Sequence, residues 1–465
     1  MTMEALSFLG GQTVAVMGLG KSGHATLRAL AAAGIRTLAW DDGAAARDRA
    51  VEDGFPVADL TEADWSKIDF LVWSPGIPHV HPMPHPVAVA ARRAGVPLIC
   101  DVELLCRAHL AARFIGITGT NGKSTTTTLV GHLLAATDAP LAVGGNLGTP
   151  ALDLPSLGLD GSYVLELSSY QLELLDQARF DIAVLLNITP DHLARHGGMD
   201  GYIEVKSSLF ARLRAHGTAV IGIDDEACAE IHQSLGQRTD ITTLPISAEH
   251  PVKGGISAPD GVLIDDSAGR AEPIVDLKTI ASLPGRHNWQ NACAAYAVAR
   301  ACGIPKEQVV AQLRSYPGLH HRQELVAIID GVRYVNDSKA TNADAAAKAV
   351  VCYDSIYWIA GGQAKEGGIE RLRPLFPHLR RAFLIGEAEQ SFAETLDKHV
   401  AYEFCGTLDV AVAKARECAL REGEVGAVVL LSPACASWDQ FKSFEHRGEV
   451  FRELVEALPG VRSAP

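Results

Sequence analysis

The segment Ile117–Thr128, with the sequence ITGTNGKSTTTT, constrains the fold of this chain more than any other feature. A phosphate-binding loop needs glycines, so that consecutive backbone N–H groups can point inward, and a following helix whose N-terminus attracts anions. It also needs a lysine to reach the β- and γ-phosphates and a hydroxyl group for magnesium. These groups follow an apolar stretch typical of a β-strand: Gly119, Gly122, Lys123 and Ser124. The segment therefore predicts an ATP-binding domain and an ATP-using enzyme.

One position of this loop departs from the usual pattern. The strict motif has a glycine five residues before Gly122, where this chain has Ile117, and the pair Thr118-Gly119 takes the place of the usual opening turn. A structural alternative is a Gly/Thr-rich turn between a strand and a helix that carries a lysine by chance. The strand before the loop and the hydroxyl-rich helix start after it favour phosphate binding.

Apolar runs alternate with helical stretches along the chain, which predicts α/β domains with parallel sheets. The 465 residues suffice for two to four domains of roughly 100–200 residues each. We expect three: a Rossmann-like N-terminal domain (1–110), a P-loop-type central ATPase domain (111–314) and a Rossmann-like C-terminal domain (315–465). Strands are expected at Thr13–Met17, Thr37–Trp40, Asp69–Trp73, Phe114–Thr118, Tyr163–Leu167, Ile182–Leu186, Ala219–Ile223, Gly261–Ile264, Val332–Val335, Ser355–Ala360, Ala382–Ile385 and Ala427–Leu431. Helices are expected at Gly23–Ala33, Ser124–Ala135 and Asn288–Cys302, and a proline-rich loop at Pro75–Pro86.

Composition narrows the classes of protein that remain. Hydrophobic residues make up 48% and charged residues 21%, as in ordinary globular proteins. The formal net charge is 41 − 55 = −14, which disfavours a broad nucleic-acid-binding or anionic-membrane surface. The start of the chain lacks the features of a signal peptide, and no apolar run reaches about 18 residues. Nine scattered cysteines without a CxxC pair fit a reducing compartment. We expect a cytoplasmic protein without nucleic-acid or membrane partners, and a monomer is our working expectation.

Two later strands end in side chains that could bind magnesium. Glu166 lies near the end of one strand, and His192 follows the next. Because ligands of open parallel sheets lie at the carboxyl ends of strands, both could approach the phosphate loop. Magnesium prefers oxygen ligands, so Glu166 is the natural ligand and His192 a less usual one. Each residue alone could also be an ordinary polar residue at a strand end, and Lys206, on a later helix, is by itself typical of a solvated surface lysine.

A second glycine motif, Gly18-Leu19-Gly20-Lys21-Ser22-Gly23, lies between the first strand and its helix. It matches GxGxxG, and Asp41-Asp42 end the second strand about 20 residues further on. The motif alone predicts a dinucleotide site with a carboxylate on the ribose hydroxyls. It is weak evidence, because mononucleotides and sugar nucleotides use the same turn and because such a turn can be purely structural.

Eight segments in order resemble the motifs of the Mur ligases, a family of ATP-dependent amide ligases that build the peptide of bacterial peptidoglycan. They are GTNGKST (119–125), GGNLG (144–148), ELSSYQLE (166–173), LNITPDHLARH (186–196), GRHNWQN (285–291), His321-Arg322, NDSKATN (336–342) and LSPACASWDQFKSFEHRG (431–448). The resemblance extends from Gly18 to Gly448. The last two motifs resemble specifically the members that add D-glutamate to UDP-N-acetylmuramoyl-L-alanine.

The resemblance implies that the N-terminal domain holds the UDP part of the substrate, the central domain ATP and the C-terminal domain the amino acid. Binding of the UDP-substrate is implied for Gly18, Leu19, Gly20, Lys21, Ser22, Gly23, Asp41, Asp42 and Ser74. ATP binding is implied for Gly119, Thr120, Asn121, Gly122, Lys123, Ser124, Thr125, Asn146, Asn291, Arg322 and Asp337. D-glutamate binding is implied for Thr341, Lys365, Ser437 and Phe444. A cation such as Lys365 suits an amino acid with two carboxylates, and Lys339 receives no separate role.

The family chemistry implies that ATP converts a substrate carboxylate into an acyl phosphate, which the amine of D-glutamate attacks. Two Mg²⁺ ions are implied, for which Mn²⁺ could substitute: one bound by Ser124 and Glu166, the other by His192 and Lys206. An ammonium group cannot bind a cation, so the resemblance implies that CO₂ carbamylates Lys206. The implied catalytic residues are Lys123, Glu166, His192 and Lys206.

Three other functions remain open on the sequence alone. The first is a related ligase for another amino acid or for folate polyglutamylation, against which DSKATN (337–342) and SPACASWDQF (432–441) argue. The second is a nicotinamide-dependent oxidoreductase that uses the first glycine motif, which leaves the phosphate loop unexplained. The third is a nucleotide switch or binding module without catalysis, in which Lys123 would not be needed for amide formation.

Overall fold

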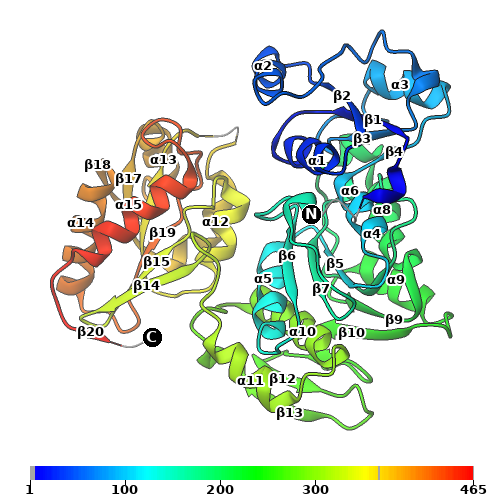
Figure 1. Cartoon of the computed structure of the whole chain (residues 1–465). Helices are drawn as coiled ribbons and strands as arrows, with labels where there is room; N and C mark the ends of the chain where they lie inside the picture. The colour runs from blue at the N-terminus through cyan, green and yellow to red at the C-terminus, as the bar shows by residue number, and fades with distance from the viewer. Residues whose placement is uncertain (1–5, 365–366, 464–465) are drawn as a thin grey trace. The chain divides into compact units, whose positions relative to one another are not determined.

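The structure, a computed structural model, describes residues 6–364 and 367–463 (Figure 1). The chain divides into two compact units, residues 1–276 with 286–315 and residues 277–285 with 316–465. Within the described residues there are three sheets, of four, nine and seven strands, each flanked by helices. The predicted α/β class is therefore confirmed. Each sheet lies inside one of the predicted domain ranges, whereas the first compact unit includes two of the sheets; the domain boundaries themselves stay a prediction.

The four-stranded sheet is parallel, in the order β2-β1-β3-β4. Its strands are β1 (Thr13–Met17), β2 (Arg36–Trp40), β3 (Phe70–Trp73) and β4 (Leu98–Ile99). Its helices are α1 (Lys21–Ala32), α2 (Ala44–Glu52), α3 (Pro86–Arg93) and α4 (Asp101–Ala108). Since β1 has later strands on both sides, the turn after it lies where the strand order reverses, the usual position of a ligand in such sheets. The predicted proline-rich loop, Pro75–Pro86, ends at the first residue of α3. Proline is tolerated there because the N–H group it lacks would have no partner within the helix.

The nine-stranded sheet has the order β13-β12-β11-β10-β9-β8-β5-β7-β6 and is parallel from β6 to β11. Its strands are β5 (Arg113–Thr118), β6 (Leu141–Gly145), β7 (Ser162–Glu166), β8 (Phe180–Leu185), β9 (Leu213–Gly222), β10 (Thr242–Ser247), β11 (Ile256–Ser257), β12 (Val262–Asp265) and β13 (Glu272–Asp276). Its helices are α5 (Lys123–Leu134), α6 (Ser169–Leu172), α7 (Leu193–His196), α8 (Met199–Ala211), α9 (Glu226–Leu235), α10 (Arg286–Ala301) and α11 (Lys306–Ser315). Helices α5 and α10 pack against each other on one face, and α8 and α9 cover the other (Figure 1).

Buried Glu103 joins α4 to the central part of the first unit. Its carboxylate accepts hydrogen bonds from the backbone N–H groups of Asp176, Gln177 and Ala178, at 2.9, 2.8 and 3.0 Å. It also accepts a bond from Nε of Arg107 at 2.6 Å. A fully buried carboxylate is tolerated only when it is paired and hydrogen-bonded. These bonds help to explain why the first two sheets belong to one compact unit.

The seven-stranded sheet has the order β18-β17-β16-β19-β15-β14-β20 and is parallel from β18 to β15. Its strands are β14 (Glu324–Ile329), β15 (Val332–Asn336), β16 (Ile356–Gly361), β17 (Leu379–Ile385), β18 (Ala401–Gly406), β19 (Val428–Leu431) and β20 (Arg462–Ser463). Its α-helices are α12 (Ala343–Val350), α13 (Glu389–Leu396), α14 (Leu408–Glu422) and α15 (Phe444–Glu456). Neighbouring residues of β16 face opposite sides of the sheet: Trp358 belongs to the cluster that includes α12 and α13, and Tyr357 to the cluster that includes α14 and α15.

Every predicted strand and helix corresponds to an observed element, with differences at the ends. The nine cysteines are free thiols. Over the described part of the chain, no helix combines the length and the apolar character that crossing a membrane requires.

Candidate active site

The phosphate loop joins the end of β5 to the start of α5. Ile117 still lies inside β5, where it is fully buried and pairs with Glu166 of β7, so the extra glycine of the strict motif would fall within a strand, one residue before its end. The loop opens instead at Gly119, with φ +154°, and closes at Gly122, with φ +84°. Because Gly122 is the N-cap of α5, the positive end of the helix dipole faces the loop.

Two asparagines support this loop from neighbouring elements. The side-chain oxygen of Asn187, just after β8, accepts a bond from the N–H of Asn121 at 2.9 Å, and its amide donates to the carbonyl of Asn121 at 3.2 Å. Asn291 of α10 accepts a bond from the hydroxyl of Thr126 at 3.2 Å. A Cβ on Gly122 would lie 2.2 Å from Oδ1 of Asn291. Asn291, which the family resemblance implies as an ATP-binding residue, therefore packs against the loop itself.

We expect Gly122→Ala to weaken ATP binding about tenfold, because alanine would have to adopt a left-handed conformation that costs about 1–2 kcal/mol. Its Cβ would also displace Asn291. Calorimetric binding of a non-hydrolysable ATP analogue measures the effect. Gly34→Ala is the matched control, because Gly34 has φ +70° but no atom within 4 Å of the position that a Cβ would take. Unchanged ATP binding in Gly122→Ala would contradict the close fit to Asn291.

Two lysines converge on one carbonyl of the loop. Nζ of Lys123 donates to the carbonyls of Gly119 and Thr120, both at 2.8 Å. Nζ of Lys206, on α8, donates to the same carbonyl of Gly119 at 2.9 Å and lies 4.7 Å from the centroid of the Tyr202 ring. Lys206 is 1% exposed, so it is not the solvated surface lysine that its sequence context alone suggests. Burial, together with the charge of Lys123, lowers the pKa of Lys206 to about 7, which favours the neutral amine.

Glu166 has one carboxylate oxygen engaged and one without a partner. It ends β7, next to β5, and is 3% exposed. Its Oε1 accepts a bond from Nδ2 of Asn146 at 2.7 Å, whereas its equally buried Oε2 has no hydrogen-bond partner. An unsatisfied buried carboxylate oxygen is costly, and a magnesium ion at the phosphate loop would satisfy it. The residue fits a magnesium ligand, and Asn146 orients it.

His192 follows β8, which borders β5 on the side opposite β7. Its backbone has φ 52°, and its side chain is 51% exposed, with Nε2 3.4 Å from the carboxylate of Asp191. Glu166 thus ends one neighbour of β5, and His192 follows the other. Within residues 6–364 and 367–463, no group of three or more His, Cys, Asp or Glu side chains forms a metal cage. A magnesium ion here would therefore complete its shell with phosphate and water oxygens.

The second glycine motif forms a tight turn between β1 and α1. A Cβ on Gly18, which has φ +90°, would lie 2.3 Å from Cβ of Ser74, and one on Gly23 would lie 2.0 Å from the carbonyl of Gly18. No atom comes within 4 Å of the Cβ position of Gly20, so that part of the turn is open to a ligand. The cavity under the turn measures about 10 Å³, room for one water at most. A nucleotide would therefore bind on the outer side of the turn.

Asp41 braces this turn with both carboxylate oxygens. Oδ2 accepts a bond from the N–H of Leu19 at 2.7 Å, and Oδ1 accepts one from the N–H of Gly43 at 2.8 Å. The more exposed Asp42 lies 3.0 Å from Nε2 of His85. Two further residues of the predicted site lie in the first turn of α1: Lys21 and Ser22. Asp41 therefore stabilises the turn from the segment that follows β2.

In the C-terminal unit, Arg447 of α15 connects the two motifs implied in D-glutamate binding. It is fully buried and donates to the carbonyls of Ser338 and Cys435, at 2.9 and 3.1 Å, and to Oγ of Ser338 at 2.9 Å. Near this connection, Nζ of Lys339 lies 5.6 Å from the centroid of the Phe444 ring. NDSKATN and SPACASW are therefore adjacent in space. Sequence reasoning did not single out Arg447, although it lies within the last quoted motif.

The other residues implied in D-glutamate binding lie as follows. Ser437 is buried, and its carbonyl accepts a bond from the N–H of Phe441 at 2.8 Å. Thr341 is half-buried just before α12. Lys365 lies outside the described residues.

Asp337 and Arg322, implied in nucleotide binding, lie in the same unit. Asp337 accepts bonds from the hydroxyl of Ser432 at 2.7 Å and from the N–H of Gln323 at 3.1 Å. Burial raises the pKa of Asp337 to about 7, against the opposing effects of the Ser432 bond and the charge of Arg322. Nε of Arg322 is buried without a hydrogen-bond partner.

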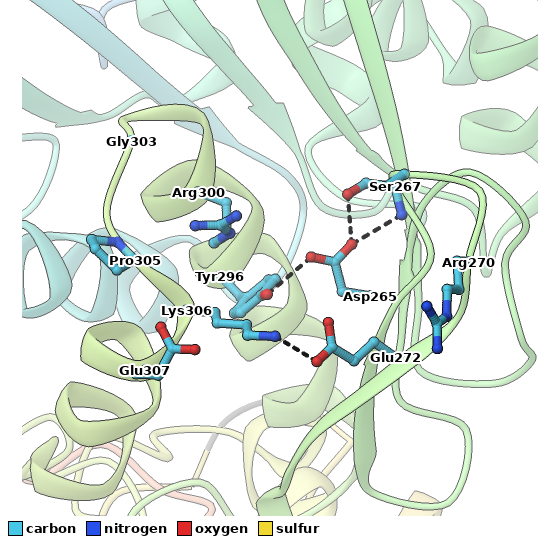
Figure 2. A pocket seen from close by; sticks show the side chains of 11 residues that line it. Asp265, Ser267, Arg270, Glu272, Tyr296, Arg300, Gly303, Pro305, Lys306 and Glu307 are labelled. Atoms are coloured by element: carbon cyan, nitrogen blue, oxygen red, sulfur yellow. Dashed lines mark hydrogen bonds and ion pairs between the residues drawn. The ribbon is translucent and has the colours of Figure 1, made fainter.

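A separate groove of about 510 Å³ lies along the later part of α10, between the β12–β13 hairpin and α11 (Figure 2). It carries both acidic and basic side chains. Lys306 pairs with Glu272, and the hydroxyl of Tyr296 donates to Asp265 at 2.9 Å (Figure 2). Charged and polar side chains of the groove pair with one another, and neither the phosphate loop nor Glu166 lines it. We therefore assign the candidate active site to the phosphate loop.

Residues 117–299 match the Mur ligase middle domain. Three curated relatives that match nearly the whole chain are each named UDP-N-acetylmuramoylalanine–D-glutamate ligase. The protein of Paramagnetospirillum magneticum is 58% identical, with 98% of this chain and 99% of that one covered. The protein of Rhodospirillum rubrum is 56% identical, with 98% and 96% covered. The protein of Caulobacter vibrioides is 50% identical, with 96% of each covered.

Solved structures share the fold at much lower identity. The UDP-N-acetylmuramate-alanine ligase MurC of Thermotoga maritima has a TM-score of 0.56 and 17% identity, with 96% of this chain and 99% of that one covered. MurF of Acinetobacter baumannii has a TM-score of 0.56 and 19% identity, with 80% and 82% covered. These matches concern the fold alone.

Proposed function

The chain belongs to the Mur ligase family, and from this premise we propose that it joins D-glutamate to UDP-N-acetylmuramoyl-L-alanine with conversion of ATP to ADP and phosphate. The observation that carries the proposal is the 58% identity to a UDP-N-acetylmuramoylalanine–D-glutamate ligase, over 98% of this chain and 99% of the relative. The protein then serves the synthesis of peptidoglycan precursors. We further propose that it works in the cytoplasm as a monomer, without nucleic-acid or membrane partners.

Each substrate has a proposed domain. Residues 1–110 bind the UDP-substrate on the outer side of the Gly18–Gly23 turn, with Asp41, Asp42 and Ser74 alongside. Residues 111–314 bind ATP at the phosphate loop. Residues 315–465 bind D-glutamate through Thr341, Lys365, Ser437 and Phe444, and contribute Arg322 and Asp337 to the nucleotide. The openness of the turn at Gly20 and the spatial proximity of NDSKATN and SPACASW support these assignments.

The reaction needs ATP because a carboxylate is a poor acylating agent. The γ-phosphoryl group passes to a carboxylate oxygen of the UDP-substrate, and ADP leaves as the bridging P–O bond breaks. The amine of D-glutamate then forms a C–N bond and loses a proton, and phosphate leaves with the electrons of the C–O bond. Lys123, already held at the loop by two carbonyls, neutralises charge on the transferred phosphoryl group.

Magnesium, when bound, supplies further neutralisation of phosphate charge. We propose that Ser124 and Glu166 hold one ion and that His192 and carbamylated Lys206 hold a second, with Mn²⁺ as a possible substitute. The buried, unpartnered Oε2 of Glu166 supports the first assignment. The buried amine of Lys206 supports the second: its neutral form can attack CO₂, form a C–N bond and lose a proton, which leaves a carbamate with oxygen donors.

Phosphate release tests the proposed function. We expect release with UDP-N-acetylmuramoyl-L-alanine, ATP and D-glutamate together, and none when any one of them is omitted. L-Alanine, L-lysine and meso-diaminopimelate are tested in place of D-glutamate. Turnover with one of these instead would indicate a related ligase of other specificity. No turnover with the complete mixture would favour a nucleotide-binding module.

A further inference from the structure

Glu173, at the end of ELSSYQLE, is the meeting point of three segments of the first unit. Its Oε1 lies 2.7 Å from Nδ1 of His196, which ends the LNITPDHLARH motif. Its Oε2 lies 2.8 Å from Nε2 of His79, in the proline-rich loop after β3. Both histidines are buried, and the side chain of Glu173 is 12% exposed. Side chains from both the N-terminal and the central sheet regions therefore converge on one carboxylate.

The protons of this cluster can be assigned because a carboxylate only accepts hydrogen bonds and an arginine only donates them. Both histidines must donate to Glu173. The other nitrogen of His79, Nδ1, accepts a bond from Nη2 of Arg92 at 2.7 Å, so this ring is neutral. The other nitrogen of His196, Nε2, lies within hydrogen-bonding distance of the hydroxyl oxygen of Ser169, at 2.9 Å. We call this set of five residues the Glu173 relay: Arg92, His79, Glu173, His196 and Ser169.

Glu173 is ionised at the centre of the relay. Burial by itself raises the pKa of this carboxyl, but the hydrogen bonds from His196 and His79 outweigh burial and lower the pKa below its ordinary value. Both histidines thus donate hydrogen bonds to a carboxylate that is largely shielded from water. Such charge-assisted hydrogen bonds are stronger than hydrogen bonds between neutral groups.

Three residues of the relay lie within five positions of a residue of the proposed active site. The pairs are Ser169 with Glu166, His196 with His192, and His79 with Ser74. The relay therefore connects the two segments proposed to hold metal with the segment proposed to hold the UDP-substrate.

The side chain of Arg195 binds the backbone of the proline-rich loop after β3. This buried side chain donates to the carbonyls of Pro75, Ile77 and His81, at 3.2, 2.9 and 3.3 Å. Its guanidinium lies 5.0 Å from the centroid of the Tyr170 ring. The loop after Ser74 is thus held by side chains from the central part of the unit.

We propose that Glu173 is a positioning residue: through the relay it fixes the loop after Ser74 relative to the segments that carry Glu166 and His192. This inference rests on the proposed function. A UDP-substrate that is held at the glycine turn must present its carboxylate to the γ-phosphate at the phosphate loop. A displacement of about 1 Å between the two ends can cost about 100-fold in rate.

Steady-state kinetics of three variants tests the relay. In Glu173→Gln the amide N–H₂ must face one of two N–H donors, so one bond is lost although the volume is unchanged. We expect kcat/KM for the UDP-substrate to fall about 100-fold, with ATP-analogue binding changed by less than about twofold. His79→Gln keeps an N–H near the position of Nε2 and should retain most of the activity. His79→Leu removes the donor and should behave like Glu173→Gln.

Glu272→Gln is the matched control, since Glu272 forms an ion pair with Lys306 in the groove of Figure 2, away from the phosphate loop. If Glu173 only filled space, Glu173→Gln would be the mildest variant. Three results would each overturn the inference. The first is activity of Glu173→Gln within about threefold of wild type. The second is a loss of ATP-analogue binding in Glu173→Gln as large as its loss of kcat/KM, and the third is equal defects in His79→Gln and His79→Leu. The wild-type protein is measured in the same assay. An inactive wild type would contradict the proposed function itself, whereas an active wild type with an equally active Glu173→Gln would contradict only the role of Glu173.

Discussion

Alanine in place of Lys123 is expected to lower the rate of phosphate release about 1,000-fold, the usual size of the loss when one charged donor to a transferred phosphoryl group is removed. Nζ of Lys123 lies 2.8 Å from the carbonyls of Gly119 and Thr120, so the side chain is already held over the loop where the phosphates would bind. The effect should fall mainly on kcat, because charge on the phosphoryl group is largest in the transition state. Coupled-enzyme detection of ADP or phosphate measures it.

Lys253→Ala is the matched control for this experiment, because Lys253 is exposed and lies outside the phosphate loop. It should leave kcat and both KM values unchanged. Amide formation by Lys123→Ala at a rate close to that of wild type would contradict a catalytic role for this lysine and would favour a loop that only binds nucleotide.

Lys206→Ala is expected to lower activity about 100- to 1,000-fold and to regain part of it when acetate is added. The reason is specific to this site: Lys206 is buried, its amine bonds to the carbonyl of Gly119, and its proposed carbamate would supply oxygen ligands to magnesium. Alanine leaves space where a short carboxylate can bind. Phosphate release with and without acetate or bicarbonate measures the loss and the rescue.

Lys206→Met serves as the control for packing, because it keeps most of the side-chain volume and leaves no room for acetate. We expect it to fold like wild type in thermal unfolding, to be inactive, and to show no rescue. Full activity of Lys206→Ala without any added carboxylate would contradict the proposed carbamate.

Much of the fold could be predicted because the parallel strands are short, continuous apolar runs. β1, β5, β7 and β8 are of this kind, and each was predicted to within two residues at either end. Other strands were not predicted, since glycine, proline or charged residues interrupt their apolar pattern: β6, β10, β13 and β18. These strands are held by pairing with neighbours rather than by their own sequence.

The residues of the phosphate loop could be predicted because their spacing is local. Lys206 could not be placed from its surroundings, because no pattern in GYIEVKSSLF shows which side of α8 faces the loop; that depends on how the helix packs. The Glu173 relay was missed for a related reason. His79 and Glu173 are 94 positions apart in the chain, and only the packing of the first two sheet regions brings them together.

Glu103 has a consequence for any attempt to divide this protein. Three backbone amides, of Asp176, Gln177 and Ala178, share its carboxylate. A fragment that ended at residue 110 would leave Glu103 without those donors, and a fragment that began there would leave the three N–H groups without their acceptor. Each piece would lose buried hydrogen bonds that the intact chain makes, so residues 1–110 and 111–314 should be expressed and studied together.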